Sequence, residues 1–439
     1  MYWRKMKPII LLFIFVIGVL ANNAFPPNAG NQYYDNNCDD LPHALDRNHP
    51  NQPNLGRSQT PNEIVGRTNS NFAFKFLKIA ASNGDQRDNS GKKNLVFSPM
   101  CISSAFAMLA LGARSETLDQ ILTGLNFKPT EIAEQNIHEG FHDLIYMLNN
   151  GSSGLHIEMG SCLFVQNKLH PQPNFLYGLR NIYRGDIYME NFRNAAETIQ
   201  HVNSYVEKKT HGKISKLVDR VDPVTEILMV SFFYMKGNWK KPFNPKYTEL
   251  REFYVDPYTV MKVPTMFQMG MFENGRDDQR ACTILKMPYE GHADAYIILP
   301  DKGQMDRVVR SLSNEAVQAW KRILHKSSVD VYMPKSKVYG ELNLKDIMYS
   351  IGIVDVFTEK ADLSGITGQP QHRVNGAIHK AVMVIDERGT EASAASAMDL
   401  VPMSMPIRFE VNRPFLAMIV ERKTACIIFM GKISNPAEN

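Results

Sequence analysis

The chain has 439 residues, of which 44% are apolar and 21% are charged. This is enough material for one large globular domain or for two to three average ones. Its formal net charge is +4, and Arg4, Lys5 and Lys7 precede an N-terminal apolar run. Without residues 1–21, the Lys and Arg count falls from 49 to 46 against 45 acidic residues, so the net charge falls from +4 to +1. The composition therefore gives no support to a general role on nucleic acid or membrane surfaces.

The N-terminus combines a basic flank with an apolar run from Ile9 to Leu20 and a small residue, Ala21. This order is typical of a secretory signal peptide, and we expect cleavage after Ala21. The alternative is an uncleaved membrane anchor, but the run is short for a bilayer span. We therefore predict a secreted, extracellular protein that does not cross a membrane. Residues 22–65 are rich in Asn, Pro, Asp and Gln and lack periodicity, which predicts a disordered polar tail.

The cysteines are few and widely spaced for a secreted protein, and they show no CxxC pair or disulfide-framework spacing. They are Cys38, Cys101, Cys162, Cys282 and Cys426. We expect most of them to be buried small apolar residues, with Cys38 in the polar tail as the exposed thiol. Asn150 begins the chain's only N-x-S/T sequon and lies in a Gly- and Ser-containing stretch, so we predict a glycan there.

From Asn69 the pattern changes, because Phe72 and Phe76 fall at helical spacing. Residues 94–97 read as a short strand. Ser98 then stands as a helix N-cap with Pro99 in the first helical position, and Gly112 is the expected stop.

A formal H-E-x-x-H motif occurs at His138, Glu139 and His142. On a helix the two histidines would lie one turn apart and could bind Zn²⁺, with the glutamate as general base. Gly140 weakens that helix, however, and the neighbouring apolar residues form an ordinary core stripe. No third ligand has a recognisable spacing, so we predict no metal site.

Further along, residues 199–206 read as an amphipathic helix and residues 227–234 as a buried strand that continues towards Trp239. Residues 295–299 and 329–335 read as strands. A lone histidine, His379, follows Ile378 in another apolar stretch that ends at Ile385.

The stretch from Glu387 to Pro406 lies between two apolar strand patterns, residues 381–385 and 414–420. As a strand, one face would carry only uncharged residues, namely Thr390, Ala392, Ala394, Ser396, Met398 and Leu400. The other face would carry both charges, through Glu391, Ser393, Ala395, Ala397 and Asp399. This pattern suits a segment that enters a sheet with one face on a core, and no proline interrupts it before Pro402. The alternative is a flexible loop rich in Ala and Ser.

Several separate motifs resemble one family. Residues 387–395 (ERGTEASAA) resemble the reactive-loop hinge of inhibitory serpins, and residues 236–243 (KGNWKKPF) resemble the serpin K-G-x-W-x-x-P-F signature. Residues 94–112 and 429–436 are similar to the serpin strand-turn-helix and to the usual serpin C-terminus. The resemblance covers residues 69–436 and is to the alpha-1-antitrypsin-like (clade A) group of secreted inhibitory serpins.

This resemblance implies an α+β serpin fold, with about three β-sheets surrounded by eight to nine helices and an exposed reactive-centre loop. The serpin domain would span residues 66–437, with the loop at residues 387–408. It also implies that the protein is no enzyme but a suicide-substrate trap, cleaved by its target serine protease and then inserting the loop into a sheet. Because Met403 is unbranched and uncharged, elastase-like or chymotrypsin-like proteases are the expected targets.

The resemblance assigns roles to particular residues. The reactive bond would be Met403–Ser404, flanked by Leu400, Val401, Pro402, Met405 and Pro406. The hinge would comprise Glu387, Gly389, Thr390, Glu391, Ala392, Ser393, Ala394, Ala395 and Ser396. Sheet opening would involve Asn94, Ser98, Pro99, Trp239 and His379. Cys101 and Ser231 depart from the family pattern, which usually has serine and asparagine there, so hydrogen bonds at these two positions are in question.

The expected partner is a protease bound covalently to a monomer, without cofactor, nucleic acid or membrane. A glycosaminoglycan stays open as a further partner, although the early helices carry no dense Lys/Arg stripe. The main alternative function is a non-inhibitory serpin that carries a hormone or another hydrophobic ligand. A heparin-activated clotting inhibitor is another alternative, but Met403 suits clotting proteases poorly.

Overall fold

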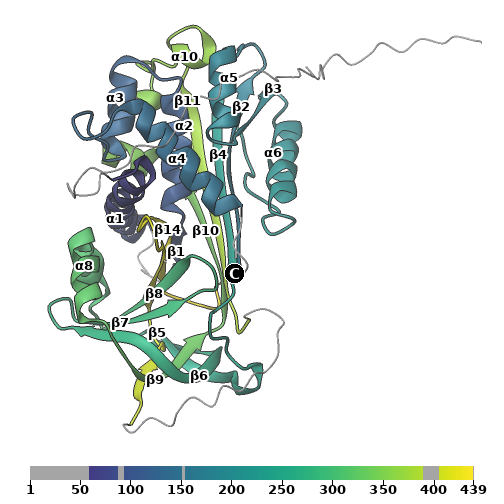
Figure 1. Cartoon of the computed structure of the whole chain (residues 1–439). Helices are drawn as coiled ribbons and strands as arrows, with labels where there is room; N and C mark the ends of the chain where they lie inside the picture. Colours follow the sequence, from purple (N-terminus) through teal and green to yellow (C-terminus); the bar gives the residue numbers. More distant parts are fainter. Residues whose placement is uncertain (1–58, 88–92, 151–153, 389–404, 439) are drawn as a thin grey trace, which may run out of the picture. The chain divides into compact units, whose positions relative to one another are not determined.

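The computed structural model describes residues 59–87, 93–150, 154–388 and 405–438. The chain divides into two units, residues 1–57 and residues 58–439, and all described residues belong to the second. The predicted signal peptide, most of the predicted tail and Cys38 lie outside the described residues. The described residues form ten α-helices and fourteen strands, which confirms the α+β prediction (Figure 1).

The smaller sheet has five strands in the order β10-β11-β4-β2-β3. These strands are β2 (Leu155–Gln166), β3 (Asp186–Glu190), β4 (Ile227–Gly237), β10 (Ser336–Asn343) and β11 (Val374–Ile385). At its centre, β11 and β4 pair in parallel, whereas each pairs antiparallel with its other neighbour. We call the β11–β4 junction the seam. The seam places His379 directly opposite Ser231, although the two residues lie 148 positions apart in the chain.

The larger sheet has nine strands, in the order β1-β14-β13-β8-β7-β6-β9-β12, with β5 paired to β6. They are β1 (Leu95–Phe97), β5 (Glu249–Asp256), β6 (Thr259–Asp277), β7 (Cys282–Pro288), β8 (Ala293–Pro300), β9 (His325–Pro334), β12 (Ile407–Glu410), β13 (Phe415–Glu421) and β14 (Ile427–Ile433). The sequence predicted about three sheets. Strand β6 is 19 residues long and pairs with β5, β7 and β9 along its length, so it joins two strand groups into one hydrogen-bonded sheet.

The helices surround these sheets. They are α1 (Pro61–Arg87), α2 (Pro99–Ala110), α3 (Ser115–Gly124), α4 (Glu134–Asn149), α5 (Pro173–Asn181), α6 (Ala195–Lys209), α7 (Met305–Ser311), α8 (Asn314–Ile323), α9 (Lys345–Ile351) and α10 (Ser364–Thr367), with 3-10 turns at Pro245–Tyr247 and Asp355–Phe357. Figure 1 shows α6 on one side of the five-stranded sheet and α2 on the other. Helix α1 begins at Pro61, inside the stretch that the sequence assigns to the tail.

The five-stranded sheet has a different apolar cluster on each of its two faces. Val202, Tyr205 and Val206 of α6 pack with Phe164 and Phe232 on one face. Side chains that point the other way, including those of Met229 and Phe233, join the main core. Alternating residues of β4 therefore serve both clusters, which explains why nearly all of this strand is buried and reads as a continuous apolar run.

Helix α2 begins as its sequence predicts. The Ser98 hydroxyl accepts a hydrogen bond from the backbone N–H of Cys101 at 3.1 Å, and Pro99 occupies the first turn. Every residue of this helix is buried, so it acts as a central support behind the five-stranded sheet. No helix among the described residues is both long and apolar enough to cross a membrane.

The close approach of the two sheets gives a first prediction. A Cβ atom at Gly340 of β10 would lie 1.9 Å from the carbonyl oxygen of Val96 on β1, and neither backbone can move without disturbing its sheet. We expect Gly340→Ala to destabilise the fold by about 1–3 kcal/mol through overpacking, measured as a lower midpoint of thermal unfolding.

The matched control is Gly178→Ala, where the nearest atom is the flexible end of Leu111 at 3.0 Å. This control should stay close to the wild type. Equal midpoints for Gly340→Ala and the wild type would contradict the close sheet contact.

Candidate functional site

The candidate site is the seam together with the chain that leaves it. Strand β11 ends at Ile385, and Asp386–Arg388 lead directly into residues 389–404, which lie outside the described residues. Parallel pairs have slanted hydrogen bonds and are slightly less stable per residue than antiparallel pairs. A chain that left β11 and turned back into the seam would run antiparallel to both β11 and β4. The topology therefore offers a place for one additional central strand.

His379 and Ser231 connect the two strands of the seam. Nδ1 of His379 lies 2.9 Å from the Ser231 hydroxyl, and Nε2 accepts a hydrogen bond from the backbone N–H of Ser98 at 3.0 Å. Because Nε2 accepts, the proton of the neutral ring sits on Nδ1 and points to Ser231. The imidazole is completely buried, and this desolvation lowers its pKa to about 3. The ring is thus neutral at physiological pH and links β11, β4 and the start of α2.

The predicted sheet-opening residues are only partly brought together. Ser98 contacts His379 and also donates its hydroxyl to the carbonyl of Ile428 on β14 at 2.7 Å. Asn94 instead fixes the C-terminal segment: its Nδ2 donates to the carbonyl of Asn435 at 2.7 Å, and its Oδ1 accepts from the N–H groups of Ser434 and Asn435. Asn94 therefore supports the entry to β1 and has no hydrogen bond to the seam among the described residues.

Both departures from the family pattern are accommodated. Ser231 retains a hydrogen bond with His379, although its side chain is shorter than the usual asparagine. The thiol of Cys101 points at the carbonyl of Phe232 on β4, with a sulfur–oxygen distance of 3.5 Å. Burial raises the pKa of this thiol to about 12, so it stays protonated and unreactive. Cys162, Cys282 and Cys426 are also free and buried, as the sequence predicted.

Trp239 lies where the chain leaves β11. Its indole N–H donates to the carbonyl of Asp386 at 3.0 Å, and its ring stacks on Tyr289 with a centroid distance of 4.3 Å and an interplanar angle of 12°. The backbone N–H of Phe243 donates to the carbonyl of Glu387 at 3.1 Å. Trp239 therefore contacts the chain directly at the point where it leaves β11.

Glu387 is buried, with 6% of the residue exposed. Its carboxylate has two partners: Lys335 Nζ at 2.8 Å and the Thr248 hydroxyl at 2.9 Å. Burial alone would raise the pKa of this carboxyl, but hydrogen bonds from Lys335, from its own backbone N–H and from Thr248 outweigh burial and hold the pKa below its ordinary value. The adjacent Asp386 pairs with Lys236 at 2.9 Å. We call this group (Trp239, Lys335, Asp386 and Glu387) the hinge anchor.

Sequence reasoning found Trp239 and Glu387 but missed Lys335, Thr248 and Tyr289. These three residues come from β9–β10, from the turn before β5 and from the end of β7. A lysine or threonine at a strand end is a common surface feature, so no local pattern distinguishes them. Their contacts with the hinge become visible only in the fold, which brings these distant elements together.

The other predicted loop residues lie mostly outside the described residues, including Met403, Ser404 and the hinge from Gly389 to Ser396. The structure resumes at Met405, which is 95% exposed, and Pro406 leads into β12. That strand pairs in parallel with β9 at the edge of the large sheet. The two ends of the loop are therefore attached to different sheets.

Asn150 is exposed at the C-cap of α4, and its side-chain oxygen accepts a hydrogen bond from Arg184 at 3.4 Å. The nearby H-E-x-x-H motif does not form a common ligand set. His138 is buried with Nδ1 on the Tyr183 hydroxyl at 2.5 Å, whereas His142 is exposed and lies 3.3 Å from Asp143. Among the described residues no group of three or more such side chains could hold a metal ion.

Comparisons with known proteins agree with this geometry. Residues 67–436 match the family described as Serpin (serine protease inhibitor). The chain is 39% identical to alpha-1-antiproteinase of Bos taurus over 369 residues, covering 84% of this chain and 87% of the relative. It is 37% identical to serpin A12 of Rattus norvegicus over 370 residues, covering 84% and 88%.

Solved structures show the same likeness. Human thyroxine-binding globulin matches with a TM-score of 0.80 and 33% identity, over 86% of this chain and all of that one. Human glycosylated kallistatin matches with a TM-score of 0.80 and 35% identity, over 87% of this chain and all of that one.

The buried imidazole predicts a specific pH dependence. Because the folded-state pKa of His379 is about 3 and the unfolded value is near 6.5, the unfolded chain binds an extra proton between these pH values. This group therefore removes about 1.4 kcal/mol of stability for each pH unit below the unfolded pKa. We expect the thermal midpoint of the wild type to fall more steeply from pH 7 to pH 4.5 than that of His379→Gln.

The exposed His142→Gln variant is the control and should follow the wild-type curve. Parallel curves for wild type and His379→Gln would show that burial of the neutral ring has no effect on acid stability.

Proposed function

The chain belongs to the serpin family, and we propose that it is a secreted serine protease inhibitor that acts as a suicide-substrate trap. The observation that carries this proposal is the parallel seam, which continues at the end of β11 into the hinge anchor and the loop. The protein supplies bait and a receptive sheet, while the nucleophile belongs to the target protease. No residue of this chain needs to be catalytic.

In the proposed reaction, the serine hydroxyl of the target adds to the carbonyl of Met403. The peptide bond to Ser404 then breaks, Ser404 becomes a new N-terminus, and Met403 stays attached to the protease as an ester. The freed segment remains joined to β11 through the hinge anchor. Its insertion into the seam would carry the protease along and distort the acylated active site before water hydrolyses the ester.

The chain lengths fit this step. Residues 389–403 number 15, whereas β4 is 11 residues long. At about 3.3 Å per residue, the segment reaches roughly 50 Å against roughly 36 Å for the strand. The inserted strand would add an antiparallel ladder on each side in place of one parallel ladder. Opening the seam separates His379 from Ser231, and because the ring is neutral no unpaired charge is left behind.

Specificity would come from Met403. A flexible, uncharged side chain suits a medium apolar primary pocket, as in elastase-like or chymotrypsin-like proteases, and cannot pair with a pocket carboxylate. Met405 is also exposed, but it lies next to Pro406 and the start of β12, close to the fixed end of the loop.

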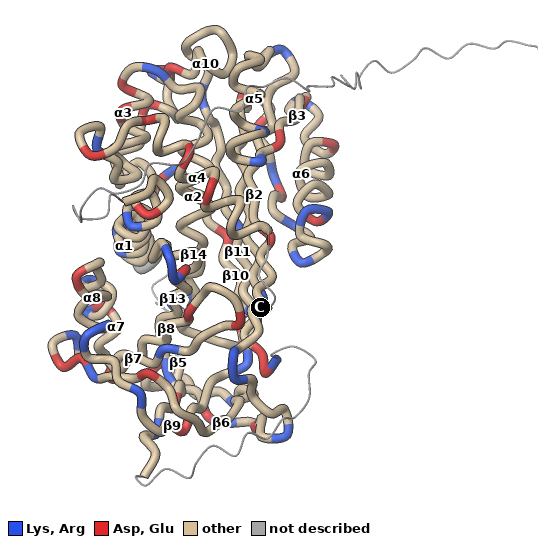
Figure 2. Tube along the Cα trace, in the orientation of Figure 1, with Lys and Arg blue, Asp and Glu red and all other residues tan. Residues whose placement is uncertain are grey.

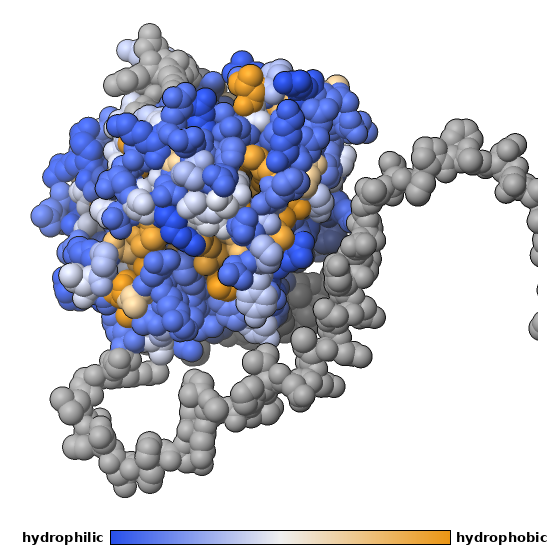
Figure 3. Space-filling model, turned by 90° about the horizontal axis from the view of Figure 1, so that it is seen from above, coloured by the Kyte–Doolittle hydropathy of each residue, from blue (hydrophilic) through white to orange (hydrophobic). Residues whose placement is uncertain are grey.

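The mature protein would start after Ala21, and its polar tail would end where α1 begins at Pro61, a few residues earlier than the sequence predicted. We also propose a glycan on Asn150 and an extracellular monomer. Figure 3 shows one face of the molecule, which is mostly polar with a few apolar patches. Figure 2 shows Lys and Arg interspersed with Asp and Glu over the helices, so no single-sign stripe favours a glycosaminoglycan.

A non-inhibitory carrier is the second candidate, because human thyroxine-binding globulin has a closely similar structure. The small, uncharged face of the hinge favours the trap, since a carrier does not need a segment that can enter a sheet. The two functions differ in one product, the covalent complex.

Denaturing gels of the mature protein with neutrophil elastase, chymotrypsin or trypsin test the trap. We expect a covalent band with elastase or chymotrypsin for the wild type. Thr390→Arg should be cleaved at the loop without a covalent band, because it places a charge on the face that meets the core. Glu391→Arg is the matched control on the opposite face and should still form the band.

Loop cleavage of the wild type without a covalent band would reject the trap in favour of the carrier. A covalent band for Thr390→Arg as strong as that of the wild type would instead reject the assignment of the inserted face.

Met403→Arg tests the bait position. An arginine can pair with the pocket carboxylate of trypsin-like proteases, so inhibition of trypsin should become at least about tenfold faster and inhibition of chymotrypsin at least about tenfold slower. Second-order rate constants of inhibition measure both. Met405→Arg is the matched control two residues away; if it redirects inhibition and Met403→Arg does not, the reactive bond lies elsewhere in the loop.

A further inference from the structure

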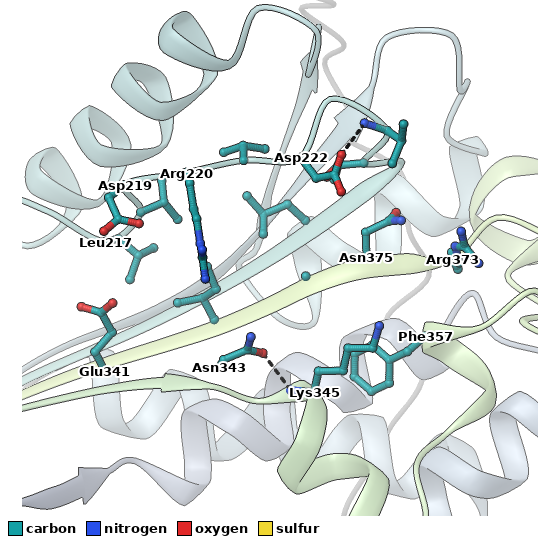
Figure 4. Close-up of a pocket in the computed structure, with 17 residues that line it drawn as sticks. Leu217, Asp219, Arg220, Asp222, Glu341, Asn343, Lys345, Phe357, Arg373 and Asn375 are labelled. Carbon is teal, nitrogen blue, oxygen red and sulfur yellow. Dashed lines mark hydrogen bonds between the residues drawn. The ribbon is translucent and has the colours of Figure 1, made fainter. Parts of the chain in front are cut away.

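A groove of about 870 Å³ lies at the end of the seam that is remote from the hinge anchor. One wall is the segment of residues 217–225, which connects α6 to β4, and the other side is formed by β10, β11 and the start of α9. Leu228 of β4 and Ile378 of β11 contribute to its apolar lining, together with the buried ring of Phe357. Figure 4 shows the connecting segment passing over the strands with this space between them.

The acidic groups that line the groove already have donors. Glu341 binds Lys380 Nζ at 3.1 Å, and Asp222 accepts the backbone N–H of Val224 at 3.1 Å. The Asp219 carboxylate lies 3.9 Å from Lys216 Nζ. Glu341 thus has a close cationic partner, whereas the Asp219 pair is exposed and the donor to Asp222 is a neutral N–H.

The basic groups are not compensated in the same way. The guanidinium of Arg220 makes no hydrogen bond or ion pair with any residue that the structure describes, and Figure 4 shows it extending from the connecting segment into the groove. Among the described residues, Lys345 Nζ makes one contact, a cation–π interaction with the ring of Tyr349 at 5.9 Å from the ring centroid. Arg373 pairs at 3.5 Å with Glu359, whose side chain is 89% exposed, so this contact is weak. Arg220 is thus the basic lining residue whose guanidinium has no partner among the described residues.

Beside these donors runs apolar surface. Val224 is 70% exposed at the rim, and Val221 and Ile378 are only partly buried. This apolar surface and the free guanidinium of Arg220 line the same groove, which matches a ligand with an apolar body and an anionic end. A guanidinium fork binds a carboxylate through two parallel hydrogen bonds, which a compact ammonium group cannot do. The volume lies within the range of small-molecule pockets.

We propose that this groove binds a small amphiphilic carboxylate, with its anionic end on Arg220 and its apolar body along Val224, Ile378 and Leu228. No residue that lines the groove belongs to the loop, and its existence does not depend on protease inhibition.

Isothermal titration of the mature protein tests the proposal with three probes: octanoate, 1-octanol, which lacks the charge, and acetate, which lacks the apolar body. We expect octanoate to bind with one-to-one stoichiometry and at least about tenfold more tightly than either partial probe. Arg220→Gln should weaken octanoate at least about tenfold and leave 1-octanol unchanged, because only the charge-assisted bonds are lost.

Lys321→Gln is the control, because it removes an exposed positive charge from α8, which packs on the large sheet away from the groove. It should bind octanoate as the wild type does. The proposal fails if octanoate does not bind, if 1-octanol binds equally well, or if Arg220→Gln and Lys321→Gln have the same effect. Arg220 is exposed on a connecting segment, so its replacement does not endanger folding.

Discussion

The neutral imidazole of His379 links the two strands of the seam to the start of α2. His379 accepts from the backbone that starts α2 and donates to the strand opposite, so helix, seam and core share one hydrogen-bonded centre. A charged ring could not occupy this position without a large desolvation cost, which is why burial shifts its pKa so far. The seam is thereby closed by short-range, uncharged contacts that can be exchanged for others without leaving a buried charge.

The two ends of the seam differ in physical character. At the hinge end, Glu387 and Asp386 are held by Lys335, Lys236 and the Trp239 indole, so the exit of the chain is fixed by ion pairs around an aromatic stack. At the other end, the segment before β4 covers the strands and leaves a groove that holds the free guanidinium of Arg220. A strand entering from the hinge end would meet His379 near the middle of β11 before it reached the groove.

Local chemistry predicted the local structure well. The Ser98–Pro99 start of α2, the burial of four cysteines and the continuous apolar character of β4 all follow from capping, size and two-sided burial. The serpin family and the α+β class could be predicted because several separated motifs agree. Pairings between residues far apart in the chain could not be predicted. His379 and Ser231 meet across 148 residues, and Glu387 meets Thr248 across 139. Likewise, nothing in the composition of residues 259–277 shows that one long strand joins two groups of strands into a single sheet. Residues 389–404 carry the clearest sequence pattern, yet they are not among the described residues.

The contacts that close the core also determine when during synthesis the chain can complete its fold. Strand β1, near the beginning of the folded region, pairs with β14. The Asn94 side chain bonds to Ser434 and Asn435, which are among the last residues of the chain. Ser70 and Asn69 of α1 likewise bond to residues 425–427. A ribosome therefore releases the first helix and strand long before their partners exist, and the nascent chain must remain open until translation has almost ended. During synthesis the protein therefore exists first as an unfinished core that lacks its final two strands.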